Sequence, residues 1–330
     1  MKKSLLQHRS QGWASYASRR LRRNSSGSER RMQIYRLAVL ITSFNRREST
    51  LRSLAALDGQ RHAADFALHV FLVDDGSTDG TADAVRSAFP DVRVLQGDGS
   101  LYWNGGMRMA FAAAMLETFD AYVLLNDDTV LYDDAVARLV ACAQMWIETG
   151  SPAIAVGSTV SPHTGEHTYG GMVKHVQGAL IRFEKIPPHE CLPIPCDAMN
   201  GNIVLIPREI ADVVGNLEMR FRHQFGDLDY ALRAKRAGFQ VIVAPGHFGE
   251  CATNSRVGTW RDSSLPLRKR WKHLLSPKGV PVQEWFLFTR RHYGWRWIYY
   301  ALSPYVQTIA SSVLSRDGAG SHRRVSRPVS

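Results

Sequence analysis

The chain has 330 residues, of which 45% are hydrophobic and 22% are charged. This composition excludes a chain too polar to form a core, and the length fits one large α/β domain with extensions or two domains. The net charge of +11 is uneven, because residues 1–36 hold ten Lys or Arg against one acid and residues 261–330 hold thirteen against three. The acidic middle of the chain argues against nucleic acid as the main ligand.

The two ends of the chain carry its basic character. Residues 1–33 are rich in Arg and Ser without a sustained period and predict a flexible basic tail, which lacks the apolar run of a signal peptide. The uncharged stretch 297–315 contains Pro304 and several serines, and is too polar to predict a membrane span. The four cysteines show no Cys-x-x-Cys spacing and predict buried free thiols in a reducing cytoplasm.

Strands and helices are predicted to alternate through residues 34–260, the expected main domain. Apolar runs predict strands at 37–41, 68–73, 92–95, 122–125, 153–157, 203–206 and 240–244. Amphipathic or capped segments predict helices at 46–57, 81–89, 106–119, 133–148 and 227–237, with another beginning at Pro207. Residues 159–195 look irregular. Such alternation indicates crossover units and a mostly parallel sheet, so the fold class is α/β.

Two carboxylates, Asp74 and Asp75, follow the second predicted strand and precede a glycine-rich turn. Ligands of open α/β sheets bind at the carboxyl ends of the strands, where a carboxylate can accept hydrogen bonds from ribose hydroxyls. The alternative is a tight turn with side-chain caps before a helix at Thr81. The whole segment after an apolar strand favours a nucleoside site.

The segment Val73–Thr81 resembles the signature of family 2 glycosyltransferases, and Ile41–Arg46 resembles the first-strand motif of that family. The resemblance covers residues 35–255. Within the family, the sequence resembles a rhamnosyltransferase-like bacterial branch. It implies the GT-A fold, a nucleotide-binding sheet flanked by helices, with a nucleotide-sugar donor and inversion at the anomeric carbon. By the same resemblance, Thr42, Ser43, Asp74 and Asp75 surround the nucleoside.

The segment Asn126-Asp127-Asp128 ends the fourth predicted strand and predicts a metal site. Hard cations such as Mg²⁺ and Mn²⁺ take carboxylate oxygens and share phosphate ligands. The segment resembles the Asp-x-Asp motif of the family, with Asn126 in place of the first Asp. Asp128 is therefore the best metal ligand, and Asp127 is expected to face the ribose or the sugar. The alternative is a cluster that caps the following helix.

A third segment contains Asp227 and Asp229 near the start of a predicted helix. Inverting transfer needs a carboxylate that takes the proton of the acceptor hydroxyl. The family pattern is Glu-Asp-x-Asp, and here Gly226 replaces the Glu; the resemblance makes Asp227 the general base. Asp229 is expected at the acceptor or sugar pocket; the other interpretation is that it braces Arg233 four residues later. The alternative is a helix capped by Asp227.

Further candidate residues lie in three loops. Trp103 could stack on a sugar or a base, and Asn104 is the best polar contact of that loop, unless both belong to a tight connection packed on the core. Asn200 and Asn202 can donate to sugar hydroxyls, or they form an ordinary turn. His247 lies just past a predicted strand, where several family members place a metal ligand, although a lone His is more often structural.

Residues 261–330 combine aromatic side chains with Arg and predict a helical extension, suited to the headgroup zone of an anionic membrane or to packing on the core. The sequence thus predicts a peripheral enzyme on the cytoplasmic membrane face. It would transfer a sugar from a nucleotide-diphosphate donor to a glycan or lipid-linked acceptor in cell-surface polysaccharide or glycolipid assembly. A nucleotidyltransferase and a non-enzymatic basic binding module are the alternatives; rhamnose, galactose and N-acetylhexosamine donors all fit.

Overall fold

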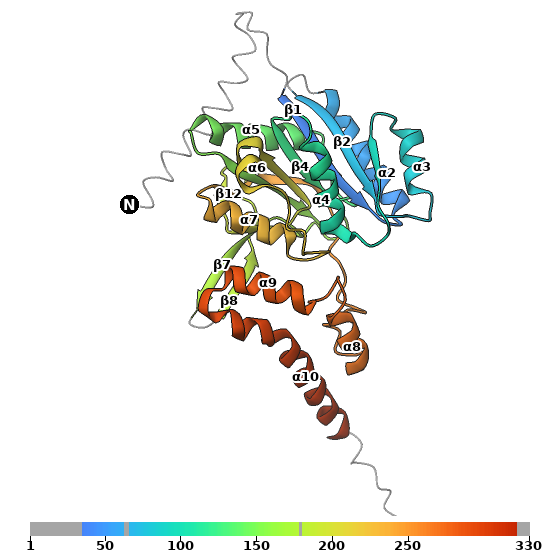
Figure 1. The fold of residues 1–330 in the computed structure, drawn as a ribbon, viewed down its shortest axis with the longest axis vertical. Coiled ribbons are helices and arrows are strands. Elements are labelled where there is room, and N and C mark those ends of the chain that lie inside the picture. Colours follow the sequence, from blue (N-terminus) through green and yellow to red (C-terminus); the bar gives the residue numbers. More distant parts are fainter. Residues whose placement is uncertain (1–34, 63–65, 178–179, 322–330) are drawn as a thin grey trace, which may run out of the picture.

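The computed structural model describes residues 35–62, 66–177 and 180–321, so the predicted tail 1–33 lies outside the described residues. Its centre is a nine-stranded sheet in the order β3-β2-β1-β4-β11-β6-β12-β5, with β9 paired to β12 (Figure 1). The strands are β1 (Tyr35–Ser43), β2 (Phe66–Asp74), β3 (Arg93–Gln96), β4 (Ala121–Leu125), β5 (Val130–Leu131), β6 (Ala153–Val160), β9 (Ile194–Pro195), β11 (Ile203–Pro207) and β12 (Gln240–Glu250).

The sheet is mostly parallel in its first half, as the alternation predicts. Strands β3, β2, β1 and β4 are parallel neighbours, whereas β11 runs antiparallel between β4 and β6. The helices of this part are α2 (Arg47–Asp58), the 3₁₀ turn η1 (Gly59–His62), α3 (Thr81–Ala88), α4 (Tyr102–Ala114), α5 (Ala135–Glu148), α6 (Arg208–Val214) and α7 (Gly226–Arg236).

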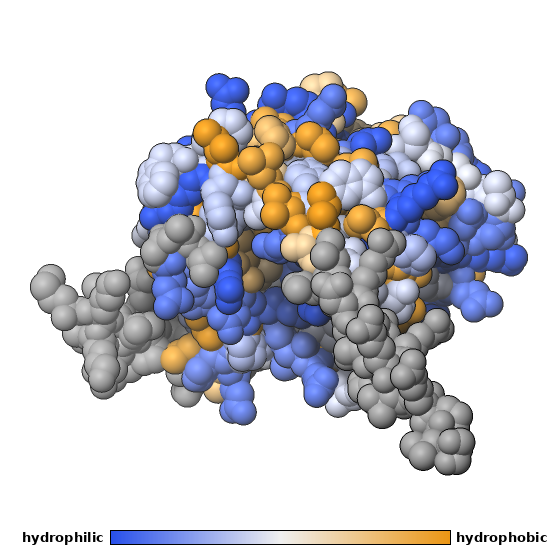
Figure 2. All heavy atoms as spheres, turned by 90° about the horizontal axis from the view of Figure 1, so that it is seen from below, coloured by the Kyte–Doolittle hydropathy of each residue, from blue (hydrophilic) through white to orange (hydrophobic). Residues whose placement is uncertain are grey.

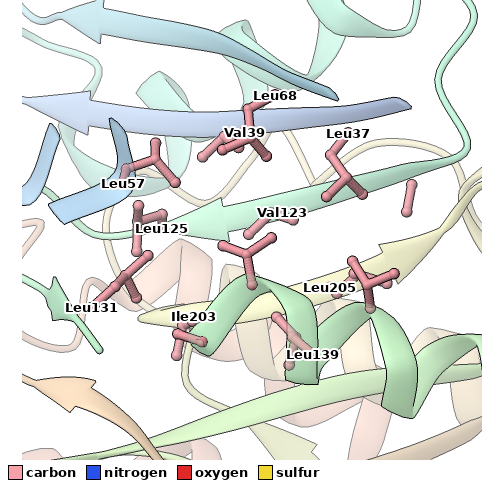
Figure 3. Packing of buried hydrophobic residues seen from close by; sticks show 14 of the residues in the cluster. Leu37, Val39, Leu57, Leu68, Val123, Leu125, Leu131, Leu139, Ile203 and Leu205 are labelled. Carbon is pink, nitrogen blue, oxygen red and sulfur yellow. The ribbon is translucent and has the colours of Figure 1, made fainter. Parts of the chain in front are cut away.

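Alternate side chains of each strand enter two different cores. Leu37 and Val39 of β1 pack with α2, α3 and α5, whereas Ala38 and Leu40 pack with α4, α6 and α7. Successive side chains of a strand point to opposite faces, so helices on both sides bury them. Figure 3 shows the first core, where side chains of β1, β2, β4 and β11 meet Leu139 of α5. This three-layer arrangement leaves the strand ends free to carry a site.

Two of the differences between predicted and observed boundaries have a visible cause. Helix α4 begins at Tyr102, four residues before the predicted start, because the Asp75 carboxylate accepts hydrogen bonds from the backbone N–H groups of Leu101 and Tyr102. Strand β12 continues beyond Ala244 to Glu250, with register shifts on both sides of His247 where it pairs with β6. Both extensions depend on partners far away in sequence, which local patterns do not contain.

The segment predicted to be irregular contains a second, three-stranded sheet. It is formed by β7 (Gly171–Gln177), β8 (Leu180–Lys185) and β10 (Ala198–Met199) in the order β10-β7-β8. Its hairpin packs against the C-terminal helices: Lys174 Nζ donates to the carbonyl of His292 at 3.3 Å, and the backbone N–H of Ile181 donates to the Tyr300 hydroxyl. The strands therefore form where tertiary contacts support them rather than where alternation is strong.

The C-terminal extension consists of α8 (Leu267–Leu274), α9 (Val282–His292), the short turn η2 (Gly294–Arg296) and α10 (Trp297–Ser321). Phe288, Tyr293 and Tyr300 form a small aromatic core with Phe221 of the main domain. Within the described ranges, α10 and the other helices all fall short of the length and apolar character needed to cross a bilayer. Cys142, Cys196 and Cys251 are buried free thiols as predicted, whereas Cys191 is exposed, which corrects that prediction.

Candidate active site

A cleft of about 620 Å³ lies at the carboxyl ends of β1 and β4, and its lining includes Lys278 of the C-terminal part of the chain. This is the edge at which open α/β sheets bind ligands, and the volume falls within the usual range for small-molecule sites. Nine of the predicted site residues line it: Thr42, Ser43, Asp75, Trp103, Asp127, Asp128, Asn200, Asn202 and Asp227. Four others, Asp74, Asn104, Asp229 and His247, lie outside the lining.

The acidic end of the cleft is formed by Asp127 and Asp128, which follow β4. The Arg46 guanidinium lies between them, with Nη1 at 3.2 Å from Asp127 Oδ1 and 2.6 Å from Asp128 Oδ2. Burial raises the pKa of Asp127 to about 6, although the charge of Arg46 opposes the shift and Asp128 adds to it. The two carboxylates thus attract one positive charge in this structure, and a divalent cation would meet the same ligands.

The described residues contain no group of three or more His, Cys, Asp or Glu side chains arranged to hold a metal ion. A cation at Asp127 and Asp128 would therefore complete its shell with ligands from elsewhere. Phosphate oxygens and water are the usual additional ligands of Mg²⁺ and Mn²⁺ at nucleotide sites. The carboxylate pair fits a metal that arrives with a diphosphate better than a permanently bound structural ion.

Asp227 occupies the first turn of α7 and faces the cleft. Its Oδ2 accepts a hydrogen bond from the backbone N–H of Gly201 at 3.0 Å, and its Oδ1 accepts one from Leu228 at 2.8 Å. Burial raises the pKa of Asp227 to about 6, against the opposing effect of these backbone hydrogen bonds. No Lys or Arg among the described residues forms an ion pair with it. Asp227 is thus a half-buried carboxylate, basic enough to take a proton near neutral pH.

Asp229 has the opposite environment, although it is only two residues away. It is completely buried and binds Arg233 Nε, Arg291 Nη1 and His292 Nε2, each at 2.8 Å. Burial alone would raise its pKa, but the hydrogen bonds from His292, Arg233 and Arg291 outweigh burial and hold the pKa below its ordinary value. The contact with Arg233 is the one that the sequence spacing predicts. Asp229 therefore does not line the cleft, where the acceptor or sugar pocket was predicted. It joins α7 to α9 instead.

Trp103 and Asn104 are neighbours in the first turn of α4, but their side chains lie in different surroundings. Trp103 lines the cleft, donates from Nε1 to Asn126 Oδ1 at 2.7 Å, and lies so close to Gly201 that a Cβ there would meet the indole at 2.4 Å. Asn104 is buried and donates to the carbonyls of Glu218 and Phe221 at 2.9 and 2.7 Å. Asn104 therefore does not line the cleft, where it was predicted to contact the nucleotide. Its hydrogen bonds fix the backbone of the segment before α7.

Gly226 occupies the position at which the family pattern has Glu. A Cβ at this position would lie 1.7 Å from Asn104 Oδ1, closer than any non-bonded contact allows. The Asn104 side chain thus takes the space that a larger residue at 226 would need. This contact explains why Gly, rather than Glu, precedes Asp227 in this chain.

Thr42, Ser43 and Asp75, which were predicted to contact the nucleoside, line another part of the cleft. Ser43 Oγ lies 2.8 Å from Thr50 Oγ1, and Asp75 Oδ1 accepts a hydrogen bond from Gly99 N–H at 2.9 Å. Asp74 is buried away from the lining, where its Oδ1 accepts from Ser77 N–H at 3.2 Å. Of the predicted carboxylate pair, Asp75 lies at the cleft, whereas Asp74 stabilises the following turn.

Asn200 and Asn202 line the cleft beside Cys251, which follows β12. The Asn200 Oδ1 atom is buried and has no hydrogen-bond partner among the described residues, so it is free to accept from a ligand. Asn202 Nδ2 donates to Cys251 Sγ at 3.3 Å, and Cys251 Sγ donates to Asp128 Oδ1 at 3.4 Å. Burial and the neighbouring Asp128 carboxylate raise the pKa of the Cys251 thiol to about 12.

His247 does not lie with Asp128, which corrects its predicted placement as a metal ligand. It sits in the irregular part of β12, with its ring 5.8 Å from that of His167. Its carbonyl accepts from Arg138 Nη1 at 3.0 Å, and burial and the Arg138 charge lower the pKa of His247. The register shifts of β12 carry Cys251, rather than His247, to the cleft.

Several lining residues were not predicted, including Arg46, Tyr169, His223 and Lys278. Arg46 stands at the end of the Ile41–Arg46 motif, so its place in the sequence was a signal that could have identified it. Lys278 lies between α8 and α9, far from any motif, and has no sequence signal of this kind. Its presence shows that the C-terminal extension forms part of the cleft wall.

The chain is similar to known glycosyltransferases in sequence. The family model described as "Glycosyltransferase like family 2" matches residues 35–273. An N-acetylglucosaminyl-diphospho-decaprenol L-rhamnosyltransferase of Mycobacterium tuberculosis is 22% identical over 255 residues, which are 71% of this chain and 78% of that protein. An uncharacterized protein of the same organism is 25% identical over 237 residues, covering 68% and 78% of the two chains.

A comparison with solved structures supports the fold through one of the two that follow, GalNAc-T7. GalNAc-T7 with UDP, GalNAc and Mn²⁺ superposes with a TM-score of 0.51 at 15% identity, over 66% of this chain and 43% of that one. A mannosyltransferase from Pyrobaculum calidifontis gives a TM-score of 0.48 at 16% identity, over 96% and 90% of the two chains. With the family match over most of the described chain, sugar transfer replaces the nucleotidyltransferase and binding-module alternatives. The protein belongs to glycosyltransferase family 2 and is a glycosyltransferase of GT-A fold.

Proposed function

We propose that this glycosyltransferase acts with inversion, moving a sugar from a nucleoside-diphosphate donor to a hydroxyl of a glycan or lipid-linked acceptor. The observation that carries the proposal is Asp227, a carboxylate without an ion-pair partner among the described residues, in the same cleft as Asp127 and Asp128. A single base at the acceptor side and acidic metal ligands at the donor side are the groups that direct displacement needs.

Asp227 would take the proton of the acceptor hydroxyl as that oxygen attacks the anomeric carbon. The bond from the anomeric carbon to the diphosphate oxygen breaks in the same step, and the nucleoside diphosphate leaves. Because attack and departure occur on opposite faces, the anomeric configuration inverts. The raised pKa of Asp227, about 6, keeps the carboxylate ionised at neutral pH while making it a better base than an exposed Asp.

Asp128, with Asp127 beside it, would hold a divalent cation such as Mn²⁺ or Mg²⁺. When bound, the cation offsets the charge that develops on the departing diphosphate. Arg46 already lies against both carboxylates and would move toward the phosphates or remain on Asp128 Oδ2. Thr42, Ser43 and Asp75 would contact the nucleoside.

The sugar would lie between Trp103, Asn200 and Asn202. The Asn200 Oδ1 atom is available for a sugar hydroxyl, and the Trp103 ring offers an apolar face. Asp74, Asn104 and Asp229 would act behind the cleft, by holding the residues that touch the substrate. The mycobacterial relative supports a deoxyhexose donor such as L-rhamnose and assembly of a cell-surface glycan.

A panel of nucleotide sugars with Mn²⁺ or Mg²⁺ tests this function, with product anomers determined by NMR. EDTA should abolish transfer, and Asp128→Asn should do so without loss of folding. Asp134→Asn, which changes an exposed carboxylate directly before α5, is the matched control and should keep full activity. Full activity in EDTA would rule out the metal role, and a retained anomeric configuration would rule out inversion.

The C-terminal extension also presents an apolar surface. Six large side chains, each 45–78% exposed, follow helical spacing along η2 and α10: Trp295, Ile298, Tyr299, Leu302, Val306 and Ile309. They share one face of the helix, opposite the buried Tyr300 and Ala301. Figure 2 views the molecule from the end that carries α10 and shows hydrophobic residues gathered in a band there. We define these six residues as the α10 stripe.

We propose that the α10 stripe rests on an anionic bilayer at the cytoplasmic membrane face. Exposed apolar patches of this kind mark interaction sites, and basic residues add attraction to anionic lipid. The extension carries thirteen Lys or Arg against three acids. Because Lys278 brings the extension to the cleft, a docked α10 would hold the cleft near lipid-linked acceptors.

Sedimentation with liposomes tests the membrane proposal. Binding should need anionic lipid and weaken in high salt, because salt screens charge attraction. Replacing Leu302 and Val306 together by Asp should abolish sedimentation, while Leu116→Asp, an exposed apolar residue elsewhere, should not. A stripe variant that instead converts a lipid-free dimer to a monomer would show that a second copy covers the stripe.

A further inference from the structure

Lys278 is a cation of the cleft wall without a counter-charge. Its side chain is exposed, and its Nζ forms no hydrogen bond or ion pair within the described part of the chain. Arg46, which lines the same cleft, is in contrast already paired with Asp127 and Asp128. An unpaired cation in a cleft attracts an anionic group of a ligand.

The backbone around Lys278 is fixed, although its charged group is free. Gln224 Nε2 donates to the Lys278 carbonyl at 2.5 Å, and Gly279 N–H donates to the Ser276 carbonyl at 2.8 Å. A Cβ on Gly279 would lie 2.2 Å from the carbonyl oxygen of His273, so this turn packs tightly against the end of α8. The base of the Lys278 side chain is therefore held at one place on the cleft wall.

His223 lines the cleft next to Lys278. Its Nδ1 atom is buried and has no hydrogen-bond partner among the described residues. Burial, with the charges of Lys278 and Arg46, lowers the pKa of His223 to about 4, so the ring is neutral and lies in positive surroundings. A phosphate group accepts hydrogen bonds from an ammonium group and from an imidazole N–H. The two side chains thus offer a phosphate both donors and positive charge.

The contacts of Lys278 follow the order of groups in a lipid-linked acceptor. On one side, Gln224 ties it to the segment that leads into Asp227, the proposed base. On the other side, the Tyr305 hydroxyl of α10 donates to the carbonyl of Val280, two residues after Lys278. Such an acceptor carries its sugar hydroxyl at one end, its phosphate in the middle and its lipid at the other end. The contacts link Asp227, Lys278 and the α10 stripe in the same order.

We propose that Lys278 and His223 form a subsite for the acceptor phosphate, the group that joins the acceptor sugar to its lipid. The Lys278 ammonium and a His223 N–H would donate to phosphate oxygens, while the donor diphosphate would bind apart from them, at Asp127 and Asp128. This inference deepens the proposed function, because it rests on a lipid-linked acceptor whose hydroxyl reaches Asp227.

Titration calorimetry of the full chain with geranyl diphosphate, a soluble prenyl diphosphate, tests the subsite. EDTA is present, so that no metal bridges the probe to the carboxylates. Lys278→Gln should weaken binding by about tenfold or more, the value of a hydrogen bond to a charged group, and His223→Phe by about threefold. Lys272→Gln, which changes an exposed lysine of α8 outside the cleft lining, is the matched control and should alter Kd by less than about twofold.

Nucleoside diphosphates distinguish the acceptor phosphate from the donor diphosphate. UDP, dTDP and GDP, each titrated with Mn²⁺, should bind wild type and Lys278→Gln with affinities within about twofold of each other. Geranyl diphosphate should still bind when the nucleotide is saturating. A loss of nucleotide affinity in Lys278→Gln as large as the loss for geranyl diphosphate would assign Lys278 to the donor and overturn the inference.

Two other outcomes contradict the inference directly. The wild-type protein fails to bind geranyl diphosphate, or Lys272→Gln weakens binding as much as Lys278→Gln, in which case a general basic surface is the cause. Failure of the proposed function has different signs, namely transfer undiminished in EDTA or a retained anomeric configuration. Because Lys278 is exposed, Lys278→Gln should fold, and circular dichroism checks this.

Discussion

The cleft wall and the layer directly behind it are formed by neighbouring residues of the same motifs. Asp227 faces the cleft while Asp229 is buried against three cationic or imidazole side chains. Asp75 and Asp74 divide in the same way, as do Trp103 and Asn104. Burial without a partner raises the pKa of Asp227, whereas hydrogen bonds from His292, Arg233 and Arg291 overcome burial at Asp229. Identical side chains thus differ in pKa and in surroundings according to their partners.

The largest effect is expected for the base. Asp227→Asn keeps the shape of the side chain but cannot take a proton at neutral pH, so kcat should fall by roughly 10²–10⁴-fold. Donor affinity should change little, because the proposed nucleotide contacts lie elsewhere in the cleft. Steady-state kinetics and donor titration measure both. If Asp229→Asn is inactive when folded while Asp227→Asn turns over normally, the base has been assigned to the wrong carboxylate.

Asp229→Asn should act on stability rather than on chemistry. It leaves Arg233 and Arg291 without their buried counter-charge, and removing one partner of a buried ion pair costs about 3–5 kcal/mol. Urea denaturation measures the loss, and Asp212→Asn, in an exposed pair with Arg208, should cost less than about 1 kcal/mol.

The pH dependence of this loss gives a second check on Asp229. Because the folded pKa of Asp229 is lowered, its contribution is present above the unfolded pKa and is lost as pH falls. The difference between wild type and Asp229→Asn should therefore shrink below about pH 4. A difference that stays constant through this range would show that the carboxylate charge is not what stabilises the junction of α7 and α9.

Activity should fall in acid because Asp227 becomes protonated. With a pKa of about 6, kcat/KM should drop about tenfold for each pH unit below 6. The stability sign is opposite to that of Asp229: a raised folded pKa favours folding below the unfolded pKa, and this contribution disappears as pH rises through 6. A pH–rate profile with no acidic limb between pH 4 and 7 would contradict the role of Asp227.

The smallest effect is expected at His247. Since it lies behind the cleft, His247→Ala should change the Mn²⁺ concentration for half-maximal activity by less than about twofold, the range typical of substitutions away from a site. Metal titration of activity measures this. A large increase in the required Mn²⁺ would restore His247 as a metal ligand and would show that β12 rearranges when metal binds.

The order of strands and helices could be predicted because β1, β2 and β4 are continuous apolar runs. The same runs end at Ser43, Asp74 and Leu125, which explains why the residues after them share one edge of the sheet. Which neighbour faces the cleft could not be predicted. It depends on the start of α4 at Tyr102 and on the register shifts of β12, both set by distant partners.

The contribution of the C-terminal extension to the cleft wall could not be predicted from the sequence either. Lys278 lies at the cleft, and the helix that follows it, α9, is fixed to α7 through Asp229; no local pattern encodes that docking. The helical character of α8 and α9 follows from composition, but the partner of each helix face does not. Strands β7 and β8 were missed for a related reason, since their pairing with each other and with the C-terminal helices outweighs weak local preference.

The contact between Gly226 and Asn104 has a consequence for the descent of this protein. The Asn104 amide fills the volume into which any side chain at 226 would project. A mutation of Gly226 alone would collide with Asn104, and a mutation of Asn104 alone would leave the carbonyls of Glu218 and Phe221 without their donor. Lineages that carry Glu at 226 should therefore carry a different residue at 104, and the two positions should have changed together.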